Sequence, residues 1–405
     1  MSCKNSGFKT LIGGLEILCL PLLLGFLYSC GGSNGGGGSE GGSATAEGWQ
    51  TVSVDTLGNV GLYTSVKVDG TGQLHVSYYD ATNLDLKYAT CVSNCTTAAN
   101  WMIVVVDSGD VGQFTSLAVD GTTGQLHITY YDHANCYLMY ATCASTCTTA
   151  ANWTNVAVDK DPAGDPGISS SLALDGTTGQ LHVSYFDGFN SLLKYATCAT
   201  NCTTASNWTI AVVDSGNVGA YSSLAVDGTG HLHLSYWDMD NGHLKYATCA
   251  STCTTAANWT IVVVDPVPNA GAWNSLAIDG TGRLHVSYYD FIHNRLKYAT
   301  CASTCTTAAN WTTVIVDTET AAGQYTSLAV DGTGLLQVSY YAGAKRNLKY
   351  ATCSSDCATA ANWTKVAVDT FGVIGLYTSL AVDGTGHLHI TYEDGTNGDL
   401  KYAEK

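Results

Sequence analysis

Seven tandem repeats, four short strand-like runs in each repeat and the lack of any helical period predict an all-β fold. Four strands in about 50 residues is typical of a β-propeller blade, and a lone blade cannot bury both faces. The sequence therefore predicts a seven-bladed β-propeller with four antiparallel strands per blade over residues 49–405. The tryptophans that open the repeats are spaced by 52, 52, 55, 51, 52 and 52 residues: Trp49, Trp101, Trp153, Trp208, Trp259, Trp311 and Trp363.

The composition of the runs predicts where each strand lies in a blade. The small-residue run "SLAVD" suits the crowded centre of a ring, whereas the β-branched run "WTIVVVD" suits the outer edge. If each blade begins with its inner strand, the outer-strand run at residues 49–55 precedes the first blade and does not belong to it. We expect it to complete the last blade beside residues 400–403, which would close the ring and leave no open sheet edge.

Twelve of the 16 cysteines form six C-x-x-x-C pairs, each between the third and fourth strands of a unit. In an exported protein these pairs predict local disulfides of modest stabilising effect. Zinc is the alternative, but successive pairs lie a blade apart, so four thiolates should not meet and we expect no metal. Cys136 is left over, as a free thiol or an intermolecular bridge. The predicted disulfides are Cys91–Cys95, Cys143–Cys147, Cys198–Cys202, Cys249–Cys253, Cys301–Cys305 and Cys353–Cys357.

The N-terminal residues are typical of an export signal. Lys4 and Lys9 precede a short apolar run at residues 17–28, which is too short for a confident membrane span. The sequence Leu-Tyr-Ser-Cys that ends at Cys30 resembles a bacterial lipobox, in which the cysteine is acylated. We expect a lipoprotein-type signal peptide over residues 1–29 and a lipid-anchored Cys30 with a Gly/Ser tether over residues 30–48. This predicts export to the bacterial cell envelope, at the outer membrane or cell surface, with simple secretion as the alternative.

The charge of the chain argues against one class of partner. Lysines and arginines number 16 against 33 acidic residues, a formal charge of -17. Phosphate backbones would be repelled, so we expect no nucleic-acid partner. We also expect no cofactor.

Three polar positions recur through the units, and we interpret all three as structural. The histidines of "LHVSYYD" should hydrogen-bond a neighbouring Ser, Tyr or Asp, since Gln337 replaces one of them: His75, His127, His182, His233, His285 and His389. One set of aspartates ends the "VVVD" strands: Asp55, Asp107, Asp159, Asp214, Asp265, Asp317 and Asp369. Another begins hairpin turns: Asp69, Asp120, Asp175, Asp227, Asp279, Asp331 and Asp383. No singular pair of acids of the glycosidase kind stands out, so no catalytic residue is assigned.

The candidate ligand site lies on one face of the predicted disc, where fourth-to-first and second-to-third loops meet. Aromatic residues that each follow a Gly-x step belong to this face: Tyr63, Phe114, Tyr221, Trp273, Tyr325 and Tyr377. So do the aspartates that end the second strands: Asp80, Asp132, Asp187, Asp238, Asp290 and Asp394. A ring beside a carboxylate suits sugar recognition, and it also suits protein contact. The alternative is that the rings only pack between blades. Ser169, Ala342 and the added Lys345 and Arg346 make the face asymmetric.

The repeat pattern "SLAVDGTGxLHVSYYD…LKYA" resembles the SYYD-type repeats of bacterial exported β-propellers, which are grouped loosely with the sialidase-like superfamily. The resemblance covers residues 49–405 and implies architecture rather than activity. Sialidases carry an arginine triad, whereas the arginines of this chain, Arg283, Arg295 and Arg346, lie in or beside predicted hairpin turns. The "DGTGxLH" turns also lack the Ser and the Thr-Trp of an Asp-box.

Together these observations predict a surface-anchored, non-enzymatic binding propeller that recognises glycan or protein through one face of the disc. Two alternatives stay open. A glycan-active enzyme, hydrolase or lyase, predicts one blade with outlying polar residues that converge on the axis. A purely structural or assembly module of the cell envelope predicts concatenation, for example through Cys136.

Overall fold

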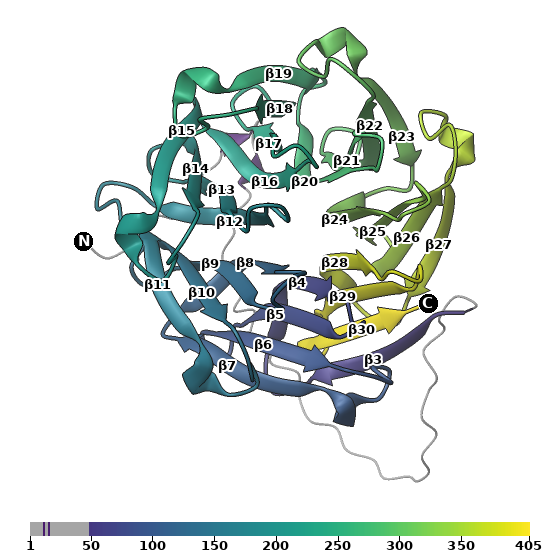
Figure 1. Ribbon diagram of the computed structural model, residues 1–405. Coiled ribbons are helices and arrows are strands. Elements are labelled where there is room, and N and C mark those ends of the chain that lie inside the picture. Colours follow the sequence, from purple (N-terminus) through teal and green to yellow (C-terminus); the bar gives the residue numbers. More distant parts are fainter. Residues whose placement is uncertain (1–10, 13–14, 17–47) are drawn as a thin grey trace.

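The computed structural model describes residues 11–12, 15–16 and 48–405. Residues 48–405 form seven four-stranded antiparallel sheets, which are arranged as blades around a central axis (Figure 1). The predicted seven-bladed β-propeller is confirmed. β1 (Leu11–Ile12) and β2 (Leu15–Glu16) pair with each other, and most of the predicted signal peptide and tether, Cys30 included, lies outside the described residues. Within the described part of the chain, no helix is long and apolar enough to cross a membrane.

Each blade runs from an inner first strand to an outer fourth strand, and blade 1 is β4 to β7. The first strands are β4 (Val60–Val68), β8 (Val111–Val119), β12 (Pro166–Leu174), β16 (Val218–Val226), β20 (Ala270–Ile278), β24 (Ala322–Val330) and β28 (Ile374–Val382). The second strands are β5 (Leu74–Asp80), β9 (Leu126–Asp132), β13 (Leu181–Asp187), β17 (Leu232–Asp238), β21 (Leu284–Asp290), β25 (Leu336–Ala342) and β29 (Leu388–Asp394).

The third strands are β6 (Asp85–Cys91), β10 (Tyr137–Cys143), β14 (Leu192–Cys198), β18 (His243–Cys249), β22 (Arg295–Cys301), β26 (Asn347–Cys353) and β30 (Asp399–Glu404). The fourth strands are β7 (Met102–Ser108), β11 (Thr154–Asp159), β15 (Thr209–Ser215), β19 (Thr260–Asp265), β23 (Thr312–Asp317), β27 (Thr364–Asp369) and β3 (Gln50–Asp55). Short 3-10 turns precede six fourth strands: η2 (Ala98–Asn100), η3 (Ala150–Asn152), η4 (Ala205–Asn207), η5 (Ala256–Asn258), η6 (Ala308–Asn310) and η7 (Ala360–Asn362).

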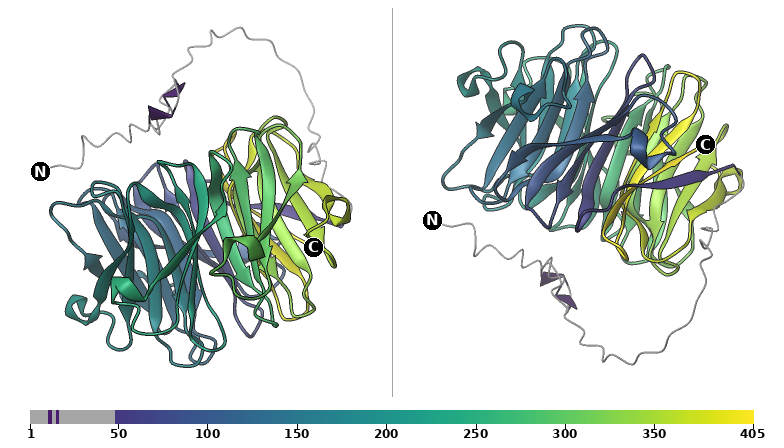
Figure 2. Two further views of the ribbon diagram at one scale, coloured as in Figure 1. Left: turned by 90° about the horizontal axis from the view of Figure 1, so that it is seen from above. Right: turned by 90° about the horizontal axis from the view of Figure 1, so that it is seen from below.

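The two ends of the ring are joined by β3, as the sequence predicts. β3 pairs antiparallel with β30 and becomes the outer strand of blade 7, so that Val52 lies opposite Tyr402. In Figure 1 the purple β3 lies beside the yellow β30. Trp49 packs edge-on against Tyr350 of blade 6, with ring centroids 5.4 Å apart. Seen from the side, the strands cross the disc from one face to the other (Figure 2).

Serines of the inner strands bond each blade to the next. In every blade the Oγ of the Ser in the "SLAV"-type run accepts the backbone N–H of a Leu or Val in a neighbouring inner strand, at 3.0–3.1 Å. These bonds between inner strands agree with the predicted place of this small-residue run at the centre. These serines are Ser65, Ser116, Ser171, Ser223, Ser275, Ser327 and Ser379.

The aspartates that end the fourth strands also act between blades. Each accepts the hydroxyl of a buried second-strand tyrosine in the next blade, at 2.5–2.9 Å. Asp55 accepts Tyr78 and Lys87 of blade 1, although it belongs to β3 in blade 7. The ring is therefore closed twice by the N-terminal segment, through β-sheet pairing and through this carboxylate.

The repeated histidines lie inside the blades and bond tyrosines, as predicted. The Nδ1 of each lies 2.6–2.7 Å from the hydroxyl of a third-strand tyrosine, and Gln337 accepts the Tyr350 hydroxyl in the same place at 2.8 Å. Burial lowers the pKa of all six histidines, so they are held neutral in the fold. Their role in the described structure is to pack and hydrogen-bond.

The six predicted disulfides are present between third and fourth strands. The carbonyl oxygen of the second cysteine in each pair accepts the indole N–H of the tryptophan that opens the next repeat. Blade 7 has no such link, and the Trp49 Nε1 has no hydrogen-bond partner among the described residues. Cys136 is also disulfide-bonded, although its partner is none of these twelve cysteines, so the free-thiol interpretation is wrong.

The closure of the ring predicts a sharp effect of truncation. Deleting residues 48–55 removes β3, exposes the edge of β30 and leaves Tyr78 and Lys87 without Asp55. We expect the unfolding temperature, measured by circular dichroism, to fall by at least about 10 °C relative to a chain that begins at residue 48. Melting of the two chains at the same temperature would contradict the closure by β3.

The buried histidines predict loss of stability in acid. Burial lowers the pKa of His127 from 6.5 to about 4, so the unfolded chain binds this proton more tightly and stability falls as the pH drops from 6.5 toward 4. His127→Gln keeps a partner for Tyr140, as Gln337 does for Tyr350. We expect the variant to lose less unfolding free energy between pH 7 and pH 4, by up to roughly 3 kcal/mol in urea titrations. Parallel pH curves for the two proteins would contradict this account.

Candidate functional site

Each inner strand carries a bulge near one face of the disc, and its sequence is Gly-x-aromatic in six blades and Gly-Ile-Ser in blade 3. In β4 the register shifts on both sides of Leu62. Gly61 has φ +89°, and a Cβ there would lie 2.8 Å from the Leu400 Cα, so only glycine permits this approach to blade 7. Tyr63 then takes a left-handed backbone with φ 54°. The bulge thereby directs the side chain after it toward the axis.

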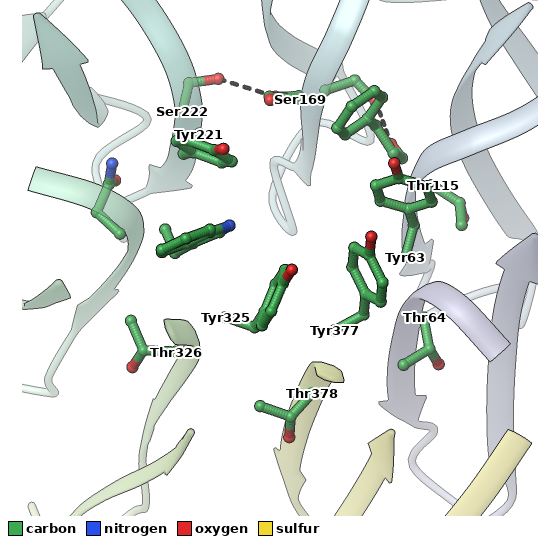
Figure 3. Close-up of a pocket in the computed structure, with 14 residues that line it drawn as sticks. Tyr63, Thr64, Thr115, Ser169, Tyr221, Ser222, Tyr325, Thr326, Tyr377 and Thr378 are labelled. Carbon is green, nitrogen blue, oxygen red and sulfur yellow. Dashed lines mark hydrogen bonds between the residues drawn. The ribbon is translucent and has the colours of Figure 1, made fainter. Parts of the chain in front are cut away.

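We call the seven residues at this position the axial collar. All have φ between 46° and 55°: Tyr63, Phe114, Ser169, Tyr221, Trp273, Tyr325 and Tyr377. The six rings are half-buried, and their contacts place them in an arc in the order 221, 273, 325, 377, 63 and 114. Figure 3 shows the four tyrosines of this arc around the pocket. Neighbouring ring centroids lie 5.4, 5.0, 4.6, 4.5 and 4.4 Å apart along this arc. Ser169 of blade 3 leaves the arc open.

The axial collar lines an open pocket of about 210 Å³. The residue after each collar position also lines it and is buried: Thr64, Thr115, Ser170, Ser222, Asn274, Thr326 and Thr378. Each of these polar side chains bonds a Ser or Thr on the second strand of the preceding blade. The pocket therefore has aromatic walls above a belt of hydroxyl and amide groups that is held rigidly by bonds between blades.

The tyrosine hydroxyls of the axial collar interact with each other. Burial, together with the neighbouring Tyr63 and Tyr325 and the Glu393 carboxyl, raises the pKa of Tyr377 well above its usual range. Tyr63 also hydrogen-bonds the Tyr377 side chain. The Tyr377 phenol is therefore neutral at physiological pH and can donate and accept hydrogen bonds.

A second layer of side chains lies behind the axial collar. In five blades an aromatic residue of the second strand packs near the collar ring of its own blade, with ring centroids 5.5–6.5 Å apart: Tyr79, Tyr131, Trp237, Tyr289 and Tyr341. Blade 7 has Glu393 at this position, opposite Leu376 in the sheet. Glu393 is 5% exposed and has no hydrogen bond or ion pair with the described residues. Burial, with the charge of Asp394 as a smaller cause, raises the pKa of Glu393 to about 7.

The structure separates the two halves of the predicted site. The six aromatic residues meet at the axis, whereas the aspartates at the ends of the second strands are buried in their own turns and do not line the collar pocket: Asp80, Asp132, Asp187, Asp238, Asp290 and Asp394. Asp80 accepts Lys87 at 2.8 Å and the Asn83 side chain at 2.8 Å. Although burial alone would raise it, these bonds lower the pKa of Asp80. We therefore build the candidate site from the axial collar without these carboxylates.

Two singular residues near the axis escaped the sequence prediction. Glu393 stands in "TYED", at a position where the other six blades have an aromatic residue: Tyr79, Tyr131, Phe186, Trp237, Tyr289 and Tyr341. Lys67 stands in "SVKVD", where the other six inner strands have alanine: Ala118, Ala173, Ala225, Ala277, Ala329 and Ala381. Both departures are visible when the repeats are aligned, which is the signal that could have found them. Among the described residues, no group of three or more His, Cys, Asp or Glu side chains could hold a metal ion.

No protein-family model matches the sequence, and no curated protein matches it at a significant level. The fold is similar to that of the polysaccharide lyase Uly1, with a TM-score of 0.53, 10% identity, and coverage of 100% of this chain and 95% of that chain. The NanB sialidase of Streptococcus pneumoniae gives 0.48, 11% identity, and coverage of 86% and 69%. The six-bladed fucose-recognising lectin of Aleuria aurantia gives 0.47, 12% identity, and coverage of 81% and 98%. At these identities the likeness to the lyase shows the β-propeller fold alone.

Proposed function

We propose that this protein is a non-enzymatic, glycan-binding β-propeller and that the axial collar is its binding site. In this proposal the protein belongs with the bacterial exported SYYD-type repeat propellers. It is held at the cell envelope by the lipid anchor at Cys30, and it presents the collar face to sugar chains. A protein partner at the cell surface is the alternative occupant of the same face.

The observation that carries the proposal is the choice of side chains at the axial collar. Ser169 adopts the same left-handed backbone as the six aromatic residues, so the bulge itself does not require a ring. A bulky residue with positive φ costs of order 1–3 kcal/mol. Six large rings at such positions, half-exposed around an open pocket, are better explained by a ligand than by packing alone. Aromatic faces stack on sugar C–H groups, and the belt supplies groups for sugar hydroxyls.

The shape of the pocket indicates how a sugar chain would bind. Its volume of about 210 Å³ is small for a ligand site, and it lies on the axis rather than along an open groove. This geometry suits the end of a sugar chain better than its middle. At Ser169 no aromatic side chain stands between Phe114 and Tyr221, and we propose that a sugar ring enters the pocket on this side.

A glycan array with residues 48–405 tests the proposal. We expect binding to one class of glycan and at least a tenfold loss in the Trp273→Ala, Tyr221→Ala double variant, because two stacking rings are removed. Phe371→Ala is the matched control, since Phe371 is 76% exposed and lies outside the collar. Equal binding by the double variant and the control would contradict the collar site. No glycan binding by the unchanged protein would favour a protein partner.

Glu393 favours a second candidate function, a glycan-active enzyme. A carboxyl that stays protonated near neutral pH is suited to act as a general acid. Glu393 has this property and lies in the layer behind the collar ring of Tyr377. The other six blades lack a carboxyl at this position, so Glu393 is the kind of outlying polar residue that the enzymatic alternative predicts.

The enzymatic alternative is tested by mass spectrometry of array-positive glycans after incubation with the protein. If Glu393 is the acid, cleavage occurs, falls as the pH rises through about 7, and is lost in Glu393→Gln while binding is kept. Intact glycan after prolonged incubation with the unchanged protein would exclude this alternative and leave binding as the function.

A further inference from the structure

Lys67 places a positive charge in the axial bore, by which we mean the space enclosed by the seven inner strands. It lies on β4, which pairs with β5 and has the inner strands β28 and β8 on either side. The remaining side of β4 faces the axis, and the Lys67 side chain is exposed. At the equivalent position the other inner strands carry alanine. A lysine is too long for the space that alanine fills between blades, so its exposed end lies in the bore.

The Lys67 ammonium has no hydrogen-bond or ion-pair partner among the described residues. The third-strand lysines are different, because their charges are neutralised inside the blades. Lys87, for example, lies 3.0 Å from Asp55 and 2.8 Å from Asp80. In a chain of net charge -17, Lys67 is thus a cation left unneutralised where protein surrounds it.

The surroundings of Lys67 disfavour its charge. The bore admits water to the side chain, but the encircling strands withdraw much of its solvation, and this burial lowers the pKa of Lys67. An anion beside the ammonium would offset that cost. Because the site is enclosed by protein, the attraction is screened less by salt than that of a surface lysine.

Lys67 and the axial collar lie along one path. On the neighbouring strand β5, Lys67 lies opposite His75, and Leu62, which precedes the collar residue Tyr63, lies opposite Tyr79. Lys67 and the collar are therefore separated by four residues of β5. At the rise of an extended strand this corresponds to about 13 Å. A short oligosaccharide covers this distance, whereas a single sugar does not.

We propose that the axial bore selects acidic glycans, and that the Lys67 ammonium binds a carboxylate or sulfate of a sugar chain that also contacts the axial collar. This inference rests on the proposed function and names its ligand class. Six blades keep alanine here, so the fold itself does not need the charge. The single lysine adds a point of recognition that neutral glycans cannot satisfy.

Isothermal titration with a matched pair of ligands tests the inference. The probes are trigalacturonate and its methyl ester, which share a backbone and differ in charge, with a sulfated disaccharide and its desulfated form as the second pair. Residues 48–405 are used, since they form the closed ring with its own core. We expect one acidic probe to bind at least tenfold more tightly than its neutral partner.

The variants isolate the charge in the bore. Lys67→Ala introduces the residue of the other blades and should abolish the preference for the acidic probe, whereas Lys67→Arg should keep it. Lys365→Ala makes the same change in net charge at an exposed lysine on the outer strand β27, away from the axis, and should have no effect. An unchanged acidic preference in Lys67→Ala, or an equal loss in Lys365→Ala, would overturn the inference.

The two proposals fail in different ways. If no acidic probe binds while neutral glycans bind the collar, the inference about Lys67 is wrong and the proposed function stands. If an acidic probe binds through Lys67 and Trp273→Ala leaves its affinity unchanged, the anion site stands and the collar proposal fails.

Discussion

The whole disc depends on the bonds between neighbouring inner strands. At the centre, serine hydroxyls accept backbone N–H groups from the next strand, and one residue earlier a second polar side chain bonds the preceding blade. These groups are buried or half-buried, so pairing them avoids a desolvation cost. The pairing fixes the distance between inner strands, and this distance fixes the width of the space on the axis.

The axial collar follows from the same constraint. Gly61 and its equivalents approach the neighbouring blade closely, and the strand recovers its register through a left-handed residue whose side chain faces the axis. A near-symmetric scaffold therefore presents seven equivalent positions around one pocket. We propose that function lies in the departures from symmetry: the opening at Ser169, the cation Lys67 and the buried carboxyl Glu393. The first shapes the entrance, and the other two add charge chemistry that the repeat as such lacks.

The repeats made the fold predictable in detail. Seven units, the small-residue inner strand and the missing seventh cysteine link correctly predicted the blades, their strand order, the closure by β3 and six disulfides. The candidate site was predicted less well. The aromatic residues were expected beside the second-strand aspartates, but alternation along a strand cannot show a bulge that turns one side chain to the axis. Lys67 and Glu393 each occur in one repeat only. They were missed because the sequence prediction used the residues that the repeats have in common.

The central claim is that the axial collar holds a sugar. A crystal structure of residues 48–405 with the strongest glycan from the array would test it most directly. We expect a sugar ring inside the collar pocket, stacked on at least one of its aromatic rings and entering beside Ser169. Sugar density on the rim of the disc or between blades, with the collar pocket unoccupied, would contradict the account.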